Sequence, residues 1–221
     1  MKKKILIFGP GDFGQVAYFY LTKDSEYQVV GFTAHKNKIK DEKLFDLPVI
    51  PFEEIEQKYP PDEFSMFIAI PYTNLNQIRA KIFSEVKQKG YELISYINSK
   101  ATVWDDINVG ENCFILENNV IQPYVTIGND VIMWSGNHVG HHTVIKDHCF
   151  LASHVVISGK VTIEPYCFLG VNATIRDGVH IAKSNIIGAG AVILKDTKEN
   201  EVYTTNSTKL LDIQSGDLKG I

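Results

Sequence analysis

The sequence lacks the features of a membrane protein, a nucleic-acid-binding protein or a disulfide-rich secreted protein. No apolar run approaches the roughly 20 residues of a membrane-spanning helix, and the run at residues 5–8 is too short for the core of a signal peptide. Three cysteines without close spacing indicate neither a disulfide framework nor a zinc knuckle. The net charge of −4 comes with no basic patch and no acidic tail. We therefore expect a soluble, cytoplasmic protein that binds neither nucleic acid nor membrane.

What the 221-residue chain does contain is a hydrophobic period of six, because every sixth position from residue 103 to residue 193 is aliphatic or methionine. The series is Val103, Val109, Ile115, Ile121, Ile127, Met133, Val139, Ile145, Leu151, Ile157, Ile163, Leu169, Ile175, Ile181, Ile187 and Ile193. This period fits neither an α-helix nor ordinary hairpins. It predicts a coil with three short sides, each of which contributes one large inward residue. Residues eighteen apart are then expected to stack in parallel at about 4.8 Å, the usual spacing between strands.

The positions two residues before this series are mostly small or β-branched, and Cys113, Cys149 and Cys167 fall there. Alternating small and large inward side chains are what the narrow interior of a prism requires. The cysteines are therefore predicted to be buried and inert, with Cys149 and Cys167 stacked on each other. A cysteine nucleophile is not expected.

The first hundred residues alternate between predicted strands and helices, which indicates a small parallel sheet of the Rossmann type. Strands are predicted at residues 3–9, 27–33, 65–70 and 92–97, and helices after the glycine loop to about residue 21, at 51–59 and at 74–90. Gly9, Gly11 and Gly14 have the G-x-G-x-x-G spacing, which presents backbone N–H groups and a helix N-terminus to a phosphate. The second strand lacks the acid that would hold an adenosine ribose, so a mononucleotide diphosphate is favoured over a dinucleotide. Glycines used only for tight packing remain the alternative.

A resemblance rests on the order of these two parts and on residues 139–196, VGHHTVIKDHCFLASHVVISGKVTIEPYCFLGVNATIRDGVHIAKSNIIGAGAVILKD. The chain resembles the hexapeptide-repeat acyltransferases. Within them it is similar to the bacterial sugar acyltransferases typified by the UDP-4-amino-sugar N-acetyltransferase of bacillosamine synthesis and by the sialic-acid O-acetyltransferase group. The resemblance implies an α/β, Rossmann-like domain at residues 1–98 that binds a nucleotide-linked sugar. It implies a left-handed parallel β-helix at residues 99–198, a C-terminal tail at 199–221, and a homotrimer with acetyl-CoA between adjacent coils and no metal.

The same resemblance assigns roles to individual residues. His141 aligns with the family's catalytic histidine and is the expected general base, because neutral imidazole accepts a proton near neutral pH. Gly159, eighteen residues later, aligns with the backbone N–H that stabilises the oxyanion. His142 stands where the related N-acetyltransferase has a glutamate that orients the base, so the orienting partner is expected from elsewhere, such as a neighbouring subunit. His138 and His142 are expected to assist His141 directly.

Further binding residues follow from the glycine loop and from the resemblance. Sugar-nucleotide contacts are expected at Gly9, Gly11, Phe13, Gly14, Thr33, Tyr72 and His138. Acetyl-CoA contacts are expected at Gly159, Gly170, Ala173, Gly188, Ala189 and Lys195. The tail, YTTNSTKLL, departs from the Gly-x-Pro-Ala-Lys phrase that usually lies near the coenzyme adenine, so this part of the coenzyme site is left open.

The remaining histidines are expected to be surface residues. His142, His148 and His154 recur every six residues, so they are predicted at three different corners of the prism and cannot converge on one metal ion within a subunit. His148, His154 and His180 are expected in solvent, and His35 lies where it could also touch a nucleotide. The γ-class carbonic anhydrases hold zinc on the same kind of coil, but they use two histidines spaced five apart, a spacing that this chain lacks.

The favoured function is acetyl-CoA-dependent N-acetylation of a nucleotide-linked amino sugar, with His141 as general base in a direct attack. The expected substrate is a 4-amino-deoxy sugar used for a surface polysaccharide, such as an O antigen, or another glycan. O-acetylation of a sugar hydroxyl is the alternative, because His141 serves either reaction. A non-catalytic trimer that binds a sugar nucleotide is a further hypothesis.

Overall fold

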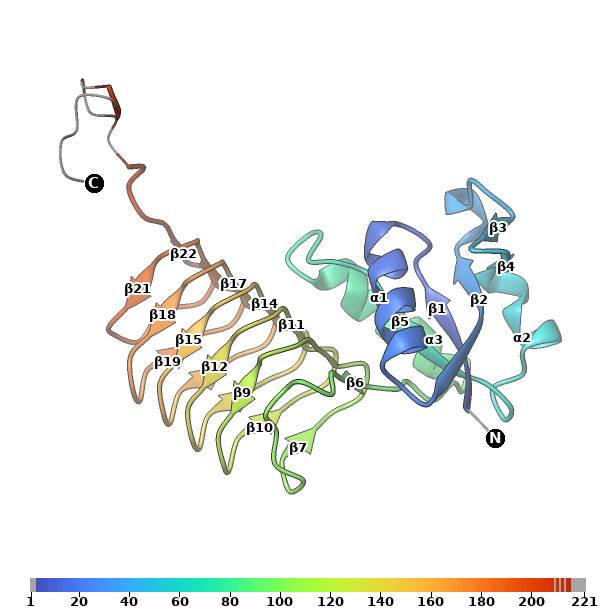
Figure 1. The fold of residues 1–221 in the computed structure, drawn as a ribbon, viewed down its shortest axis with the longest axis horizontal. Helices are drawn as coiled ribbons and strands as arrows, with labels where there is room; N and C mark the ends of the chain where they lie inside the picture. The colour runs from blue at the N-terminus through green and yellow to red at the C-terminus, as the bar shows by residue number, and fades with distance from the viewer. Residues whose placement is uncertain (1–2, 209, 211, 213, 216–221) are drawn as a thin grey trace.

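The computed structural model describes residues 3–208, 210, 212 and 214–215. Its first part is a five-stranded sheet with helices on both faces (Figure 1). The strands are β1 (Lys3–Phe8), β2 (Tyr27–Ala34), β3 (Lys43–Leu44), β4 (Leu47–Pro51) and β5 (Ser65–Ile68), in the order β3-β4-β2-β1-β5. The helices are α1 (Asp12–Lys23), α2 (Ile55–Lys58) and α3 (Gln77–Gln88), with 3-10 turns at Lys36–Lys38 and Phe52–Glu54. None of the helices in this described part combines the length and apolar character needed to cross a bilayer.

The sheet is mixed, whereas the sequence predicts a wholly parallel one, because β3 and β4 form an antiparallel hairpin. Its turn residues Phe45 and Asp46 have φ of 51° and 61°, the left-handed backbone of a tight hairpin turn. Sequence patterns do not predict this hairpin, since its turn lacks the glycine or asparagine that marks such turns. The predicted strand at 92–97 is only partly confirmed. Leu93 makes only a single bridge to Met66, and β6 (Tyr96–Ile97) pairs with the coil instead.

The second part is the predicted left-handed coil of stacked parallel sheets (Figure 1). Its strands are β7 (Asn108–Val109), β8 (Phe114–Ile115), β9 (Val120–Ile121), β10 (Thr126–Ile127), β11 (Ile132–Met133), β12 (His138–Val139), β13 (Val144–Ile145), β14 (Phe150–Leu151), β15 (Val156–Ile157), β16 (Thr162–Ile163), β17 (Phe168–Leu169), β18 (Thr174–Ile175), β19 (His180–Ile181), β20 (Ile186–Ile187), β21 (Val192–Ile193) and β22 (Val202–Tyr203). Paired strands match residues eighteen apart, such as Val139 opposite Ile157. The predicted register is therefore confirmed.

The large residues of the hexads fill the interior of the coil. Every member of the series from Ile115 to Ile193 is at most 4% exposed, and Val103 and Val109, in the first turn, are partly buried. Each turn covers the inner face of the next, so the stack forms one cooperative core. The cysteines lie in this core, and burial raises the pKa of the Cys113 thiol to about 12. The prediction that all three thiols are buried is confirmed.

The corners of the prism have left-handed backbone, and most carry a residue other than glycine. At His142, His148 and His154 φ is 59°, 59° and 60°. These histidines follow β12, β13 and β14 in turn and so occupy three different corners, as predicted. Each such residue costs about 1 kcal/mol relative to a right-handed conformation, a cost that the hydrogen-bonded stack offsets.

The first domain covers one face of the prism. The seven-stranded sheet β22-β20-β17-β14-β11-β8-β6 forms this face, and its outward residues Phe114, Ile132 and Phe150 share a buried apolar cluster with Ile5 and Phe67 of the first domain. The other two faces, β21-β18-β15-β12-β9 and β19-β16-β13-β10-β7, carry no part of the first domain (Figure 1). We call them the β12 face and the β13 face.

Candidate active site

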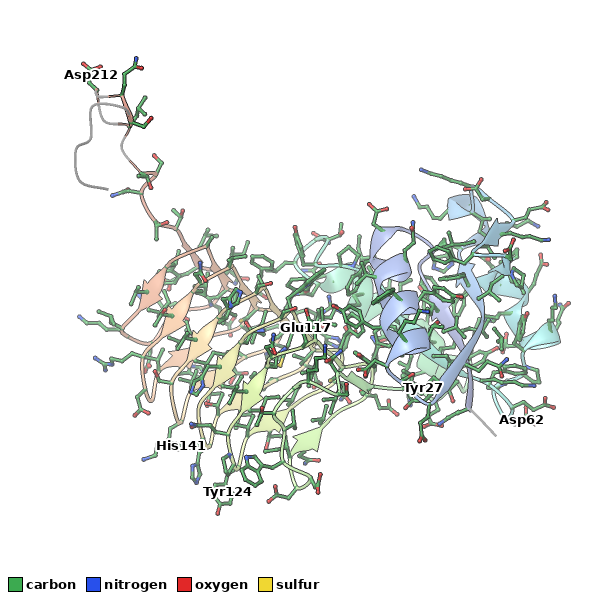
Figure 2. All side chains as sticks on the ribbon, viewed as in Figure 1. Tyr27, Asp62, Glu117, Tyr124, His141 and Asp212 are labelled. Atoms are coloured by element: carbon green, nitrogen blue, oxygen red, sulfur yellow. The ribbon has the colours of Figure 1, made fainter. Side chains whose placement is uncertain are left out.

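His141 lies on the edge where the β12 face meets the β13 face. Its backbone N–H donates to Oε1 of Gln122 at 2.9 Å, and its carbonyl accepts from Lys160 at 2.8 Å. These bonds fix the backbone on both sides of the residue, while the imidazole remains exposed to solvent. In Figure 2, His141 and Tyr124 lie together on the edge of the coil, remote from Tyr27 and Asp62 of the first domain.

Gly159 lies one turn along the coil from His141, as predicted. A Cβ atom at Gly159 would lie 2.9 Å from Nε2 and 2.8 Å from Cε1 of His141, so only glycine leaves room for the imidazole in this position. Gly159 is buried, and its N–H donates to no acceptor among the residues that the structure describes. Buried N–H groups are nearly always paired. Because the Gly159 N–H has no such partner within the described residues, it is a candidate hydrogen-bond donor to a bound ligand.

His142 contacts His141 directly. The two Nδ1 atoms are 3.0 Å apart, so one nitrogen donates and the other accepts. The ring of Tyr124 packs on His142 with a centroid distance of 4.7 Å. From the sequence, the orienting partner of His141 is expected to come from elsewhere, but in the structure His142 itself lies at Nδ1 of His141.

Asp177 also lies at this edge, although it is not among the residues predicted from the sequence. Its Oδ1 lies 2.9 Å from the position of a Gly159 Cβ, on the opposite side from His141. Gln122 and Tyr124 are further contacts that are not predicted from the sequence. Asp177 is predictable from the eighteen-residue repeat. Residues 141, 159 and 177 are eighteen apart and therefore stack on successive turns of the coil, in what we call the His141 column.

The predicted phosphate loop lines a pocket of about 630 Å³ in the first domain. Gly9, Gly11, Phe13 and His35 line it, together with the basic residues Lys38, Lys40 and Lys43 and with Asp41. His35 is held by two carboxylates, with Nδ1 3.2 Å from Glu53 and Nε2 3.1 Å from Glu85. The pocket therefore combines a helix N-terminus with lysine ammonium groups, an arrangement that suits a phosphorylated ligand.

Of the predicted sugar-nucleotide residues in the first domain, Gly14 and Thr33 line neither this pocket nor the aromatic pocket described next. Gly14 packs against the loop, since a Cβ there would lie only 1.8 Å from the carbonyl oxygen of Gly9. Thr33 is completely buried, and its hydroxyl donates to the carbonyl of Ile50 at 2.7 Å. Both residues are packed behind the site, so they support its shape and do not lie where a side chain could contact the sugar nucleotide directly.

An aromatic pocket of about 650 Å³ adjoins the first one and shares Asp12, Phe13 and Pro71 with it. Tyr72 packs against Phe150 and Phe168, with centroid distances of 4.9 and 4.8 Å. Trp134, Gly170 and Ala189 add coil residues to the lining. The predicted residues Phe13, Tyr72, Gly170 and Ala189 thus come together where the first domain meets the coil.

The predicted coenzyme residues divide between two edges of the prism. Gly159 and Lys195 share the column of His141, whereas Gly170, Gly188 and Ala189 lie on the edge beside the first domain.

Ala173 is 0% exposed and faces the core, so it has no surface to offer a coenzyme. A side chain at Gly188 would meet the carbonyl oxygen of Tyr203 at 2.8 Å. His138 lies on the β12 face, between Val120 and Val156.

The remaining histidines lie apart from this site. The sequence predicts that His148 is a solvated corner residue, and this prediction is wrong. Its side chain is only 15% exposed, contacts Asp130 at 2.8 Å and stacks on Tyr166. His154 is exposed, as expected, and His180 is exposed and pairs with Glu164 at 3.1 Å. Among the residues that the structure describes, no group of three or more His, Cys, Asp or Glu could hold a metal ion.

Comparisons with known proteins match both parts of the chain. Residues 4–86 match the PglD N-terminal domain model, and residues 160–195 match the bacterial transferase hexapeptide (six repeats) model. The chain is similar to the acetyltransferase domain of PglB from Neisseria gonorrhoeae in complex with acetyl coenzyme A, with a TM-score of 0.80 and 21% identity over 91% of this chain and 96% of that one. It is similar to PerB from Caulobacter crescentus in complex with CoA and GDP-perosamine, with a TM-score of 0.76 and 24% identity over 91% of each chain. WeeI from Acinetobacter baumannii gives a TM-score of 0.76 at 21% identity over 90% of this chain and 94% of that one.

Proposed function

We propose that the chain is a hexapeptide-repeat acyltransferase that transfers an acetyl group from acetyl-CoA to the amine of a nucleotide-linked amino sugar, which the family models matching its two parts support. One observation carries this proposal: Nε2 of His141 lies beside the backbone of Gly159, whose buried N–H has no partner in the described part of the chain. A base for the nucleophile and a donor for the developing oxyanion are the two groups that acyl transfer from a thioester needs.

The reaction follows from these two groups. The amine nitrogen attacks the thioester carbonyl carbon, an N–C bond forms, and the carbonyl electron pair moves to oxygen, where the Gly159 N–H donates to the oxyanion. Nε2 of His141 takes a proton from the nitrogen. The intermediate then collapses, the C–S bond breaks, and the proton passes to the coenzyme A thiolate, which leaves an amide and a free thiol. No acyl-enzyme is needed, and the buried cysteines could not supply one.

His142 determines which nitrogen of His141 is free to act. When His141 carries its proton on Nδ1, that N–H donates to Nδ1 of a neutral His142, and Nε2 stays unprotonated beside Gly159. After proton transfer the imidazolium keeps the same hydrogen bond. The neutral ring of His142 thus fixes the tautomer, a role that a carboxylate fills in the related N-acetyltransferase.

The first domain is the proposed sugar-nucleotide site. The loop at Gly9 and Gly11, the N-terminus of α1 and the surrounding lysines would hold the diphosphate. The similarity to PerB, which has been solved with CoA and GDP-perosamine, supports an amino-sugar nucleotide as substrate. A 4-amino-deoxy sugar remains our choice within this class.

One chain does not bring the two halves of this site together. The first domain covers one face of the prism, and His141 lies on the edge opposite that face. The β12 face is open and partly apolar, with Val120 39%, Val156 42% and Val192 59% exposed on its outward side. A ring of copies packed through this face places the His141 edge of one copy beside the aromatic pocket of the next. We therefore propose a homotrimer, with each site shared between subunits.

The direct test is acetyl transfer in vitro. Purified protein is mixed with acetyl-CoA and a panel of nucleotide-linked amino sugars, and free thiol and acetylated product are measured. We expect turnover of at least one amino sugar, and loss of at least 100-fold in His141→Asn, because general base catalysis typically contributes 10²–10⁴-fold. No turnover across the panel, or full activity in His141→Asn, would contradict the proposal.

A further inference from the structure

We propose that Asp177 binds the substrate amine and makes this site selective for an amine over a hydroxyl. This inference rests on the proposed acyl transfer and identifies the chemical group that accepts the acetyl. The structural basis is the convergence of two side chains over Gly159. Nε2 of His141 and Oδ1 of Asp177 each lie 2.9 Å from the point where a Gly159 Cβ would be.

The space between these two atoms suits one small polar group. His141 and Asp177 do not form an ion pair with each other, and Asp177 has no ion-pair partner in the part of the chain that the structure describes. His141 and Asp177 are both exposed, so a substrate group can approach the space between them from solvent. Because both atoms lie 2.9 Å from one point, a substrate atom on the solvent side of the line that joins them can also lie about 2.9 Å from each. This is hydrogen-bonding distance.

An amine can satisfy both groups, whereas a hydroxyl cannot. The neutral amine that attacks has two N–H bonds, so it can donate one to the Asp177 carboxylate and the other to Nε2 of His141. A hydroxyl has one O–H, and the proton that it gives to His141 leaves nothing for Asp177. A carboxylate bound to a charged donor is a strong hydrogen-bond acceptor.

The charge that develops on the attacking atom also favours an amine over a hydroxyl beside Asp177. As an amine attacks the thioester, its nitrogen becomes positive, and the Asp177 carboxylate stabilises that charge. As a hydroxyl attacks, its oxygen becomes negative when His141 removes the proton, and the same carboxylate opposes it. Asp177 therefore lowers the barrier for N-acetylation and raises it for O-acetylation.

The test compares two acceptors that differ only in one group. The amino-sugar nucleotide that the wild-type protein acetylates is paired with the same compound carrying a hydroxyl in place of the amine, and kcat/KM is measured for both. Asp177→Asn keeps the size of the side chain and removes its charge. We expect kcat/KM for the amine to fall roughly 10- to 100-fold, the loss of a charged hydrogen bond, while transfer to the hydroxyl stays the same or rises. If the hydroxyl compound gives no measurable turnover in any variant, the fall with the amine is judged against the control below.

Asp105→Asn is the matched control. Asp105 lies in the same column, two turns from His141 on the opposite side from Asp177, and has no position over Gly159. Its removal is expected to leave kcat/KM unchanged. Circular dichroism and the assembled mass of both variants verify that the coil is intact.

The outcomes separate this inference from the proposed function. Turnover that depends on His141 but keeps its amine preference in Asp177→Asn would overturn the role of Asp177 alone. So would an equal fall with both acceptors, since that result would assign Asp177 to the orientation of His141. Absence of acetyl transfer by the wild-type protein, or transfer that survives His141→Asn, would instead remove the proposed function.

Discussion

Arg79 and Asp130 form an ion pair shielded from solvent where α3 meets the coil: Nε and Oδ1 are 3.0 Å apart, and both side chains are 0% exposed. The carboxylate also accepts from Asn112 at 2.7 Å and contacts His148 at 2.8 Å. The guanidinium donates to the carbonyls of Asp130 and Cys149. A buried charge needs such pairing, since an unpaired one loses its hydration without compensation. The two parts of the chain are therefore joined by a charged network as well as by an apolar core.

Asp130→Asn should destabilise this junction by about 3–5 kcal/mol, because the substitution leaves Arg79 buried without a countercharge. Asparagine tolerates the φ of 57° at this corner, so the effect reports the charge and not the backbone. Unfolding in urea measures the change. Lys87→Gln is the control, since it breaks the partly exposed Lys87–Glu111 pair and should cost less than about 1 kcal/mol. Equal effects from the two variants would contradict the importance of burial here.

His142→Phe should lower kcat about tenfold or more, because the phenyl ring cannot accept the Nδ1–H of His141 and the reactive tautomer is no longer favoured. An aromatic residue fits the corner, as Tyr124 and Tyr166 adopt φ of 66° and 64° at equivalent corners. The measurement is the steady-state rate of thiol release with saturating acetyl-CoA. His180→Phe makes the same change at an exposed histidine on the β13 face, which the proposed interface does not use, and should have no effect. Undiminished turnover in His142→Phe would show that another group orients the base.

Asp24 should make the protein less stable in acid. Hydrogen bonds from the Ser99 hydroxyl and then from the Tyr96 hydroxyl hold the pKa of its carboxyl below the ordinary value of 3.8. A group whose pKa is lower in the folded state stabilises the fold above its unfolded pKa, and this contribution disappears as the pH falls through the folded pKa. Asp24→Asn should therefore flatten the dependence of unfolding free energy on pH below about pH 4.

The control for this prediction is Asp106→Asn. The Asp106 side chain is exposed and makes no hydrogen bond or ion pair with the residues that the structure describes. Urea unfolding between pH 3 and pH 6 compares the two variants with the wild-type protein. If Asp24→Asn keeps the wild-type slope, the bonds to Ser99 and Tyr96 contribute no acid sensitivity.

Val156→Lys should dissociate the proposed trimer, because it places a charge in the centre of the open β12 face, where Val156 lies between His138 and Thr174. Sedimentation velocity is expected to show a smaller species, and acetyl transfer should fall with it. Thr162→Lys on the β13 face makes a comparable change on a polar surface, next to Val144 and His180. It should leave the mass unchanged. Normal assembly of Val156→Lys would place the interface elsewhere.

The coil could be predicted in detail from the sequence because its environment repeats. Each hexad meets the same neighbours in the turns before and after it, so the positions of Val139 and Ile157 follow from spacing alone. The same arithmetic places Gly159 beside His141. It also places Asp177 there, one further turn along the coil.

Features that depend on contacts between distant segments could not be predicted in this way. His148 occupies a corner like that of His154, yet α3 covers it, and its carboxylate partner lies on the preceding turn. Thr33 lies near the end of β2, close to where ligands of such sheets often bind. It is buried there beside β4, and its hydroxyl donates to the carbonyl of Ile50 in that strand. The β3–β4 hairpin itself has turn residues that give no local signal. In each case the side chain's role was set by an element that the sequence pattern did not place.

The separation of His141 from the glycine-loop pocket within one chain has a genetic consequence. His141→Asn damages only the half-site on the coil edge. Gly11→Trp blocks only the glycine-loop pocket, and the fold can accept it because a Cβ at Gly11 would meet no atom within 4 Å. Each variant alone should be inactive. Co-expressed with different tags and purified through both, the two should complement each other, because a mixed assembly contains junctions with both halves intact. Two defective alleles of this protein are then expected to restore activity together, and one defective allele should weaken the wild-type product in the same cell.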